Sequence, residues 1–560
     1  MAIKLLVTWG IALGLLVMSM LLPKIRITKG KEFIIDYGKL KVALISTCVF
    51  MFLAYTFAYT NGIFLFDASF IYRGINLTPD SVSDKWLSPY LSVLDMGVNL
   101  PWLGGIFTVL FMVISVYLIV DMLNITNKVG IWAVAGLCST NSSIICQQEY
   151  TGGSYTGEIA LFFACLAAWY AIKGKASFKS MILTIVFVAL SAGTYGSYVS
   201  VTPCLMIISV IIDIFDGKYQ KKNWTKICSC FFEFLLGIFL YYVILRAEMH
   251  FMKAGLQSYM GEDALANASG ILAMFKWIPR AYENIVDYYV GGSAGGFLPA
   301  YMAYIMMVVF GMGGFIFIIY FIINFKKINS EKGNTILLLL LLIVFPLAIN
   351  LIYVMSSGNV HFMMIFSYVM PFILMVKIAE ELKENFNNGH WNYKGIYKAF
   401  YSGVAIFIFC GIVLSNAIFS RYYGMYVEAQ SIGTRVLDRI ENCENFTGTE
   451  RIVIIGAMQN DTYYGSTDEN RAEVFDALIG CANYRNINGV NYGSWLRRFI
   501  TNILGSNMDY TSYTTFTKCI ESENLDSQEV EILENMNYFP RYESVQKIGD
   551  IIFIKFPDDI

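Results

Sequence analysis

Residues 61–101 read NGIFLFDASFIYRGINLTPDSVSDKWLSPYLSVLDMGVNLP and lie between two apolar runs, 42–59 and 104–120. Each of these runs is close to the length that a helix needs to cross the hydrocarbon core of a bilayer, about 20 residues. The stretch between them carries several of the chain's scarce ionisable residues, among them Asp67. We therefore expect an external loop that joins two membrane helices.

The composition of the whole chain places it among membrane proteins. Of its 560 residues, 56% are hydrophobic and 15% are charged, whereas soluble domains carry roughly 25% charged residues. Apolar runs of membrane-spanning length recur, which predicts an all-α polytopic membrane protein with about 12 transmembrane helices. The predicted spans are 4–23, 42–60, 104–123, 129–147, 157–173, 180–195, 197–215, 227–245, 301–325, 334–354, 361–378 and 399–418. The first is expected to be retained, because it lacks the small-residue cleavage site of a signal peptide.

The distribution of Lys and Arg predicts the orientation. Alternate loops are rich in lysine, as at 24–41, 173–179 and 218–226, and cytoplasmic loops keep such residues. The N-terminus, the loops 61–103 and 246–300 and the C-terminal region are then expected to be extracytoplasmic, in a multi-pass protein.

The chain becomes polar after about residue 419, and it ends in a different kind of structure. Residues 451–456 (RIVIIG) and 550–556 (DIIFIKF) have the pattern of buried strands. We therefore expect three parts: an extra span with a basic loop (1–41), a transmembrane catalytic domain (42–418) and a small extracytoplasmic α/β domain (419–560). Three cysteines fall in this last part, and the sequence leaves any disulfide pairing open: Cys443, Cys481 and Cys519.

Three carboxylates of the 61–101 stretch are candidate catalytic residues: Asp67, Asp80 and Asp84. Asp67 lies among phenylalanines, where partial burial would raise its pKa towards the value that suits a general base. The alternative is that Asp67 caps a helix or pairs with Arg73, and that Asp80, after Pro79, belongs to a turn. The acids could also hold a divalent cation. No other cofactor is expected, because histidine is scarce and the cysteines lack the spacing of a metal site.

Cations of the predicted external side are candidates for binding a phosphate: Arg246, Lys253, Arg280 and His361. Arginine offers a fork of donors that matches a phosphate, although Arg246 could equally anchor its helix at the membrane interface. Residues with which an acceptor could interact complete the set: Arg73, Lys85, Trp86, Glu149 and Tyr150. No phosphate loop, GxGxxG or DxD pattern accompanies them, which argues against a soluble nucleotide donor. No nucleic acid partner is expected.

Three segments together carry a family resemblance. They are SDKWLSP at 83–89, PWL at 101–103 and LSAGTYGSY at 190–198. Their order and spacing resemble the bacterial Gtr-type polytopic glucosyltransferases, the type II serotype-converting group, over about residues 40 to 420. Those relatives show Gly-Arg-Trp where this chain has Asp84-Lys85-Trp86. The tryptophan is the same and a basic residue precedes it in both, but aspartate stands in place of the glycine.

The resemblance implies a GT-C-like enzyme in the bacterial plasma (inner) membrane. Such an enzyme moves a hexose, in this family glucose, from a polyprenyl-phosphate carrier to a cell-surface glycan on the outer side of the bilayer. The essential acid of the family lies in the first large outer loop, which points to Asp67. Two other functions remain open at this stage: a flippase for lipid-linked polysaccharide, and a glycan polymerase or ligase.

Overall fold

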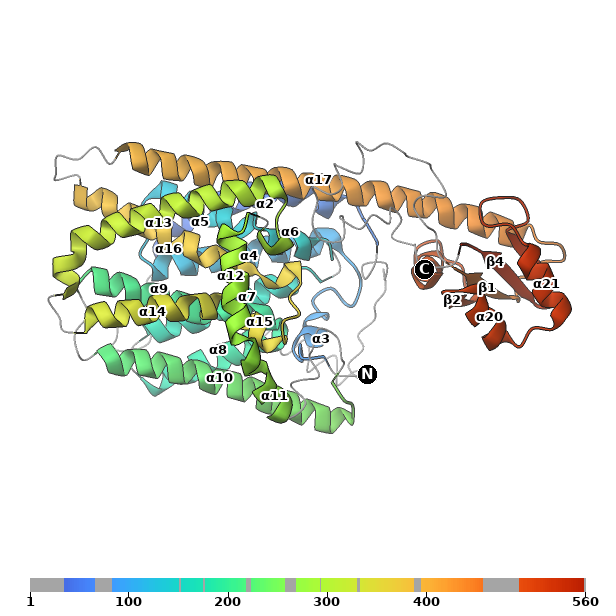
Figure 1. Cartoon of the computed structure of the whole chain (residues 1–560), viewed down its shortest axis with the longest axis horizontal. Helices are drawn as coiled ribbons and strands as arrows, with labels where there is room; N and C mark the ends of the chain where they lie inside the picture. Colours follow the sequence, from blue (N-terminus) through green and yellow to red (C-terminus); the bar gives the residue numbers. More distant parts are fainter. Residues whose placement is uncertain are drawn as a thin grey trace.

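The computed structural model is a helical bundle with a small domain beyond one of its ends (Figure 1). The structure describes residues 35–65, 83–150, 153–174, 177–217, 223–256, 268–292, 294–329, 333–386, 394–456 and 493–557. The predicted span 4–23 and the candidate residues Asp67, Arg73 and Asp80 lie outside these ranges.

Seven helical segments of the described chain are long and apolar enough to cross a membrane. They are α2 (Tyr37–Thr60), α4 (Pro101–Met122), α7 (Tyr155–Lys173), η2 with α9 (Gly196–Phe215), α10 (Asn223–Met252), α13 (Ala300–Asn329) and α17 (Lys394–Glu441). An eighth would be the pair α5 (Lys128–Ser139) and α6 (Ser142–Gln148), which is bent by 48°. The chain is therefore a multi-pass, mainly helical membrane protein, as predicted.

The predicted number of twelve spans is not confirmed, and the shortfall has physical reasons. Two apolar helices, α8 (Phe178–Thr194) and α14 (Asn334–Ile349), are too short to count as spans by length. The run 334–354 is divided at Asn350, after which α15 (Leu351–Met355) begins. The run 361–378 starts as two 3-10 turns, η6 (Phe362–Met364) and η7 (Phe366–Val369), and becomes α-helical only in α16 (Met370–Phe386).

Helix α7 forms the centre of the bundle. It packs against α4, α8 and α9, and most of its side chains are buried. Its neighbours α8 and α9 are joined by the 3-10 turn η2 (Gly196–Ser200), which contacts both of them. All five residues of η2 are buried, and this turn lies at the bundle end towards the C-terminal domain.

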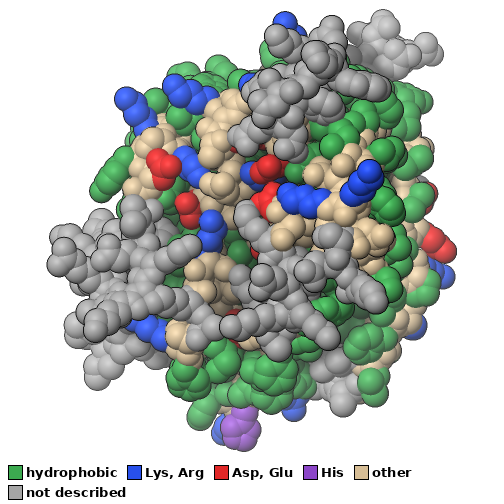
Figure 2. Space-filling model, turned by 90° about the vertical axis from the view of Figure 1, so that its left-hand side faces the viewer, with side chains coloured by type: hydrophobic (Ala, Val, Ile, Leu, Met, Phe, Trp, Pro, Cys, Tyr) green, Lys and Arg blue, Asp and Glu red, His purple; other side chains and the backbone are tan. Residues whose placement is uncertain are grey.

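Lysines gather at the opposite end, which we call the basic end (Figure 2). There Asn124 lies in the turn before α5. Its side-chain Oδ1 accepts a hydrogen bond from Lys39 Nζ (3.1 Å), and its backbone carbonyl accepts one from Lys377 Nζ (2.9 Å). The carboxylate of Glu380 accepts from the amides of Thr126 and Asn127 at the same turn. We call the other end, which carries residues 83–100, the site end. The predicted grouping of basic loops is therefore observed, and which end faces the cytoplasm stays a prediction.

Helix α17 joins the bundle to the C-terminal domain. Its 48 residues correspond to about 72 Å of helix, more than twice the ~30 Å hydrocarbon core. Buried residues recur at helical spacing along its whole length, from Phe400 to Ile440, so one face remains covered beyond the membrane. The predicted domain boundary at 419 falls inside this helix.

The C-terminal domain contains a four-stranded sheet in the order β2-β1-β4-β3. The strands are β1 (Arg451–Ile455), β2 (Asp509–Tyr513), β3 (Val545–Ile548) and β4 (Ile551–Lys555), and β1 pairs in parallel with both β2 and β4. In the described part of the domain, three helices accompany them: α19 (Gly493–Asn502), α20 (Phe516–Glu523) and α21 (Ser527–Asn535). Both predicted strands are thus confirmed. Cys443 and Cys519 are free thiols, and Cys481 lies outside the described residues.

One ion pair of this domain predicts a pH-dependent stability. Glu450 accepts hydrogen bonds from Lys547 Nζ (2.6 Å) and from the amides of Thr447 and Gly448, and the bond from Lys547 is the main cause that lowers the pKa of Glu450 to about 2. A carboxyl group whose pKa is lowered by folding stabilises the fold above its ordinary pKa of 4.5 and loses this effect as the pH falls towards 2. Glu450→Gln should therefore speed hydrogen exchange of the β3 and β4 amides at pH 7 and leave it near wild type at pH 2. Glu531→Gln, at an exposed position, is the control, and equal effects of both variants at pH 7 would contradict the prediction.

Candidate functional site

Residues 83–100 lie across the site end of the bundle and are fixed to three helices. The short helix α3 (Ser88–Leu91) lies in this segment, with proline in its first turn. The amide of Leu87 donates to the carbonyl of Gly193 at the end of α8 (2.7 Å). Tyr241 of α10 donates its hydroxyl to the carbonyl of Asp84 (3.1 Å), and Tyr155 of α7 donates to Asp95 (3.0 Å). The segment is therefore held in place by the bundle.

Trp86 packs directly on the backbone of α8. A Cβ atom added to Gly193 would lie 2.2 Å from Cε2 of the indole, which no side chain could tolerate. The indole Nε1 is buried and has no hydrogen-bond partner among the described residues. Glycine at position 193 is therefore what allows the tryptophan to lie where it does.

Lys85 and His361 come together here, although they are 276 positions apart in the chain. The Lys85 ammonium lies 4.9 Å from the centroid of the Tyr195 ring, a cation–π distance. His361 lies just before η6, outside the membrane-spanning helices, and burial together with the charge of Lys85 lowers its pKa. Its Nδ1 atom is buried without a partner in the described part of the chain. A cation and a buried imidazole with an unpartnered nitrogen thus share one site, and together they could bind an anionic group.

The charge of Lys85 can be tested through His361. Lys85→Met should raise the pKa of His361 part of the way to its ordinary value, because burial continues to lower it. The chain has only three histidines, so the pH dependence of His361 acylation by diethyl pyrocarbonate can be measured in a His250→Gln, His390→Gln background. Lys39→Met, at the basic end, is the matched control. An unchanged His361 pKa in the Lys85 variant would show that the two groups are not close.

Asp84 adds a carboxylate to the same site. Its Oδ2 atom lies 3.6 Å from the position that a Cβ atom of Gly196 would occupy, so it faces the η2 turn. Ser83 Oγ donates to Asp84 Oδ1 (3.4 Å). The structure therefore assembles Asp84, Lys85 and Trp86 against the 193–198 turn.

The other predicted cations are distributed along two helices. Arg246 occupies an exposed position on α10, a little more than one turn beyond Tyr241, and Lys253 follows that helix. Arg280 of α12 (Ile278–Val290) lies 5.0 Å from the ring of Trp277. That ring packs so closely on Gly358 that an added Cβ would lie 2.7 Å from it. Arg280 is thereby placed near the segment that leads to His361, and no described contact joins Arg246 or Lys253 to Lys85.

Glu149 and Tyr150 follow α6, near a buried polar network. Glu149 is almost fully buried and caps the helix, and Tyr150 is partly buried. The network itself centres on Glu158 of α7, whose carboxylate accepts from Gln148 Nε2 (3.0 Å) and lies 3.5 Å from Gln147 Nε2. These contacts place a fully buried carboxylate in the part of the bundle nearest the site.

The same network is hydrogen-bonded to the end of α2 and to the η2 turn beside the site. Tyr59 at the end of α2 donates to Gln148 Oε1 (3.0 Å), and Tyr198 of η2 donates to Gln147 Oε1 (2.5 Å). The Tyr198 and Tyr195 rings lie 5.9 Å apart, and Tyr195 contacts Lys85. The network therefore supports the turn on which the candidate site is built.

Sequence reasoning missed Gly193, Tyr195 and Tyr241 as site residues. Tyr195 and Tyr198 are predicted from sequence as packing residues, and the only signal for more is their position in the LSAGTYGSY segment. Tyr241 sits in an apolar run with no polar neighbours to single it out. Among the residues that the structure describes, no group of three or more His, Cys, Asp or Glu side chains could hold a metal ion. A divalent cation at the loop acids stays a prediction, because Asp67 and Asp80 lie outside the described ranges.

The comparison with protein families agrees with this geometry. The model of the family described as Glucosyl transferase GtrII matches residues 83–372. The match begins at the Ser83-Asp84-Lys85-Trp86 segment and extends beyond His361, so it contains every described residue of the site. No curated protein matches this chain. Since the family match covers more than half of the sequence, the chain belongs to the GtrII glucosyl transferase family.

Proposed function

We propose that this glucosyltransferase takes its hexose, glucose by family, from a polyprenyl-phosphate donor and transfers it to a cell-surface glycan on the outer side of the membrane. The observation that carries the proposal is that Lys85 lies against the Tyr195 ring at the site end of the bundle, close enough to His361 for its charge to help lower the pKa of that imidazole. A cation beside an N–H donor suits a phosphate ester at the membrane surface, and the sequence contains none of the motifs that bind a soluble nucleotide.

In the proposed reaction, the acceptor hydroxyl attacks the anomeric carbon of the donor sugar. Asp67 takes the proton of that hydroxyl, the bond between the anomeric carbon and the phosphate oxygen breaks, and the lipid phosphate leaves with its electrons. Lys85, His361 and Arg280 would stabilise the charge that develops on the phosphate. Asp84, Glu149, Tyr150 and Trp86 would position the sugars, and Asp80 and Arg73 would assist Asp67.

We propose that the site end faces outward from the bacterial inner membrane. The concentration of lysines at the basic end supports a cytoplasmic position for that end. The C-terminal domain would then lie outside the membrane on the same side as the site, where it could contact the acceptor polymer.

The donor can be identified with the purified full chain. Membrane vesicles from a strain lacking this gene supply the acceptor, and radiolabelled polyprenyl-phosphate glucose or UDP-glucose supplies the sugar. We expect label to reach the glycan only from the lipid-linked donor, and Lys85→Ala to lower kcat/KM for that donor by about 10-fold or more, as the loss of a charged contact implies. Lys39→Ala at the basic end should have no effect. Transfer from UDP-glucose would overturn the proposal.

A further inference from the structure

Helix α7 carries a buried carboxylate in its first turn, at the site end of the bundle. Glu158 is fully buried. The side chains that donate to its carboxylate, Gln147 and Gln148, are uncharged amides. Burying an acid in a membrane-spanning helix is costly, and such residues are commonly functional. Glu158 is therefore a candidate for a role in the reaction as well as in packing.

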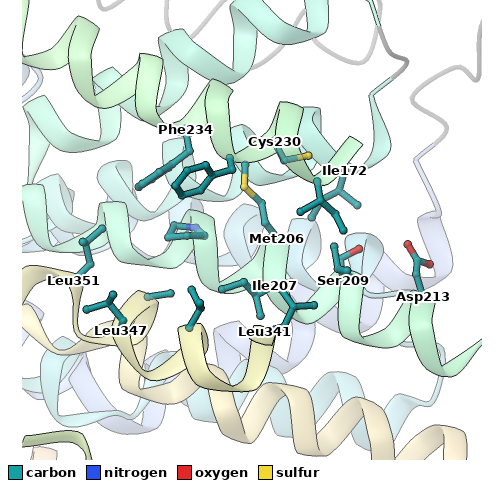
Figure 3. Close-up of a pocket in the computed structure, with 16 residues that line it drawn as sticks. Ile172, Met206, Ile207, Ser209, Asp213, Cys230, Phe234, Leu341, Leu347 and Leu351 are labelled. Carbon is teal, nitrogen blue, oxygen red and sulfur yellow. The ribbon is translucent and has the colours of Figure 1, made fainter. Parts of the chain in front are cut away.

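The opposite part of α7 has different surroundings. There Ile172 lines a groove of about 370 Å³, together with residues of α9, α10 and α14. Figure 3 shows Met206, Phe234 and Leu341 facing this groove, and most of its lining is apolar. Glu158, the one acidic residue of α7, thus lies at the end of the helix that carries the site.

The carboxylate fixes the orientation of both glutamine amides. Each amide turns its Nε2 towards Glu158, at 3.0 Å for Gln148 and 3.5 Å for Gln147, which leaves each Oε1 to accept from a tyrosine. Tyr59 donates its hydroxyl to Gln148 (3.0 Å), and Tyr198 donates to Gln147 (2.5 Å). Glu158 thus determines that both tyrosines donate into the network.

The two tyrosines belong to the two parts of the proposed active site. Tyr59 is in the last turn of α2, and the stretch that contains Asp67 follows this helix in the sequence. Tyr198 belongs to η2, and its ring lies 5.9 Å from that of Tyr195, the residue that contacts Lys85. One carboxylate is therefore linked to the segment that leads to the proposed base and to the turn beside the proposed phosphate ligand.

We propose that Glu158 is a positioning residue for sugar transfer. By orienting the Gln147 and Gln148 amides, it sets the placement of the Asp67 segment relative to Lys85. This inference rests on the proposed function, which assigns the base to the one and the donor phosphate to the other. Glu158 acts through the two amides and does not itself touch the sugar.

Replacing Glu158 by Gln should break this arrangement on one side. The new amide nitrogen would face a glutamine Nε2, and two donors cannot pair. Gln147 is held by the carbonyl of Ser154, to which its Nε2 donates (2.6 Å). The Gln148 amide should therefore turn instead, and Tyr59 should lose its acceptor. We expect kcat for transfer from polyprenyl-phosphate glucose to fall about tenfold or more, with the KM for the donor near the wild-type value, because the η2 side of the network is kept.

A compensating substitution should restore the rate. Gln148→Glu in the Glu158→Gln background exchanges the acid and the amide. The carboxylate at position 148 then accepts from Tyr59 and from the new amide, whose oxygen accepts from Gln147. Every donor again has an acceptor, so kcat should return close to the wild-type value. Gln147→Glu in the same background should not restore it, because the carbonyl of Ser154 would lose its donor and face a carboxylate.

Gly157→Ala tests the η2 side and leaves every polar group in place. A Cβ at this position would lie 1.7 Å from Gln147 Nε2, so the amide must move although alanine favours the helix. Tyr198 should then lose its acceptor, and the KM for the lipid-linked donor should rise several-fold through Tyr195 and Lys85. An unchanged donor KM in Gly157→Ala would overturn the proposal even if the Glu158 variant does not insert into the membrane.

Glu380→Gln is the matched control for Glu158→Gln. Glu380 is likewise buried, but it lies at the basic end, where it accepts from the amides of Thr126 and Asn127. This variant should lose stability and keep both kinetic constants. Wild-type kcat in Glu158→Gln, no rescue by Gln148→Glu, or equal rescue by Gln147→Glu would overturn the role of Glu158. Transfer by the wild type from UDP-glucose alone would instead overturn the proposed function on which this role rests.

Discussion

Replacing Asp67 by Asn should lower the rate of hexose transfer by about 10²- to 10⁴-fold, the range that a general base contributes. Asparagine has nearly the shape of aspartate and cannot accept the proton of the acceptor hydroxyl. The measurement is the initial rate of label transfer from polyprenyl-phosphate glucose at saturating donor. Since the substitution removes the proton acceptor and leaves the substrate contacts in place, kcat should fall and KM should change little.

The control for Asp67→Asn is another aspartate of known structural role. Asp36 caps α2 at the basic end, where Oδ1 accepts from the amides of Gly38 and Lys39. Asp36→Asn should cost no more than about 1 kcal/mol of stability and should leave kcat unchanged. Full activity of Asp67→Asn would transfer the role of base to Asp80 or Asp84, which the corresponding asparagine variants would then identify.

Adding a single methyl group at Gly193 should abolish most of the activity. In Gly193→Ala the new Cβ would lie 2.2 Å from the Trp86 indole, so the indole and the Asp84-Lys85-Trp86 segment must move. Overpacking of this kind costs about 1–3 kcal/mol, and a shift of about 1 Å in a positioning residue can cost roughly 10² in rate. We expect a loss of this order in kcat/KM with the chain still inserted in the membrane.

Two other glycines provide the matched controls for Gly193. An added Cβ at Gly311 or Gly314 of α13 meets no atom within 4 Å, so the alanine variants should be fully active. The double variant Trp86→Ala, Gly193→Ala tests whether the loss of kcat/KM comes from the clash with the indole. Once the indole is removed, Gly193→Ala should lower kcat/KM little further. Additive losses in this double variant would show that Gly193 acts through something other than Trp86.

The apolar runs of the sequence predicted the helices of the bundle well, because burial in a bilayer demands long uninterrupted apolar segments. They could not predict the length of α17. Its outer part is amphipathic rather than apolar, and it stays helical because residues such as Ile432 and Val436 pack against the C-terminal domain and its neighbours. The break at Asn350 was equally hidden, since the side chain of Asn350 is satisfied by Ala281 and Asn284 of α12, which are remote in sequence.

The site could be predicted only in pieces. Local patterns identified Lys85 as a loop residue and His361 as a candidate phosphate ligand, but only the fold brings the two together. The hydrogen-bond network beneath them was also beyond prediction, because nothing in the sequence shows that Gln147 and Gln148 bond to Glu158. Their hydrogen bonds to Tyr59 and Tyr198 depend on the packing of α2, α6, α7 and η2.

We propose that this chain adds one hexose to a surface glycan and that Asp67 is its base. The most direct measurement is the glycan composition of the cell surface in a deletion strain, complemented with the wild type or with Asp67→Asn. We expect one hexose side group to disappear on deletion, and only the wild-type gene to restore it. Loss or shortening of the whole polymer would contradict transfer of a single hexose and favour a polymerase or flippase. Full restoration by Asp67→Asn would contradict the assignment of the base.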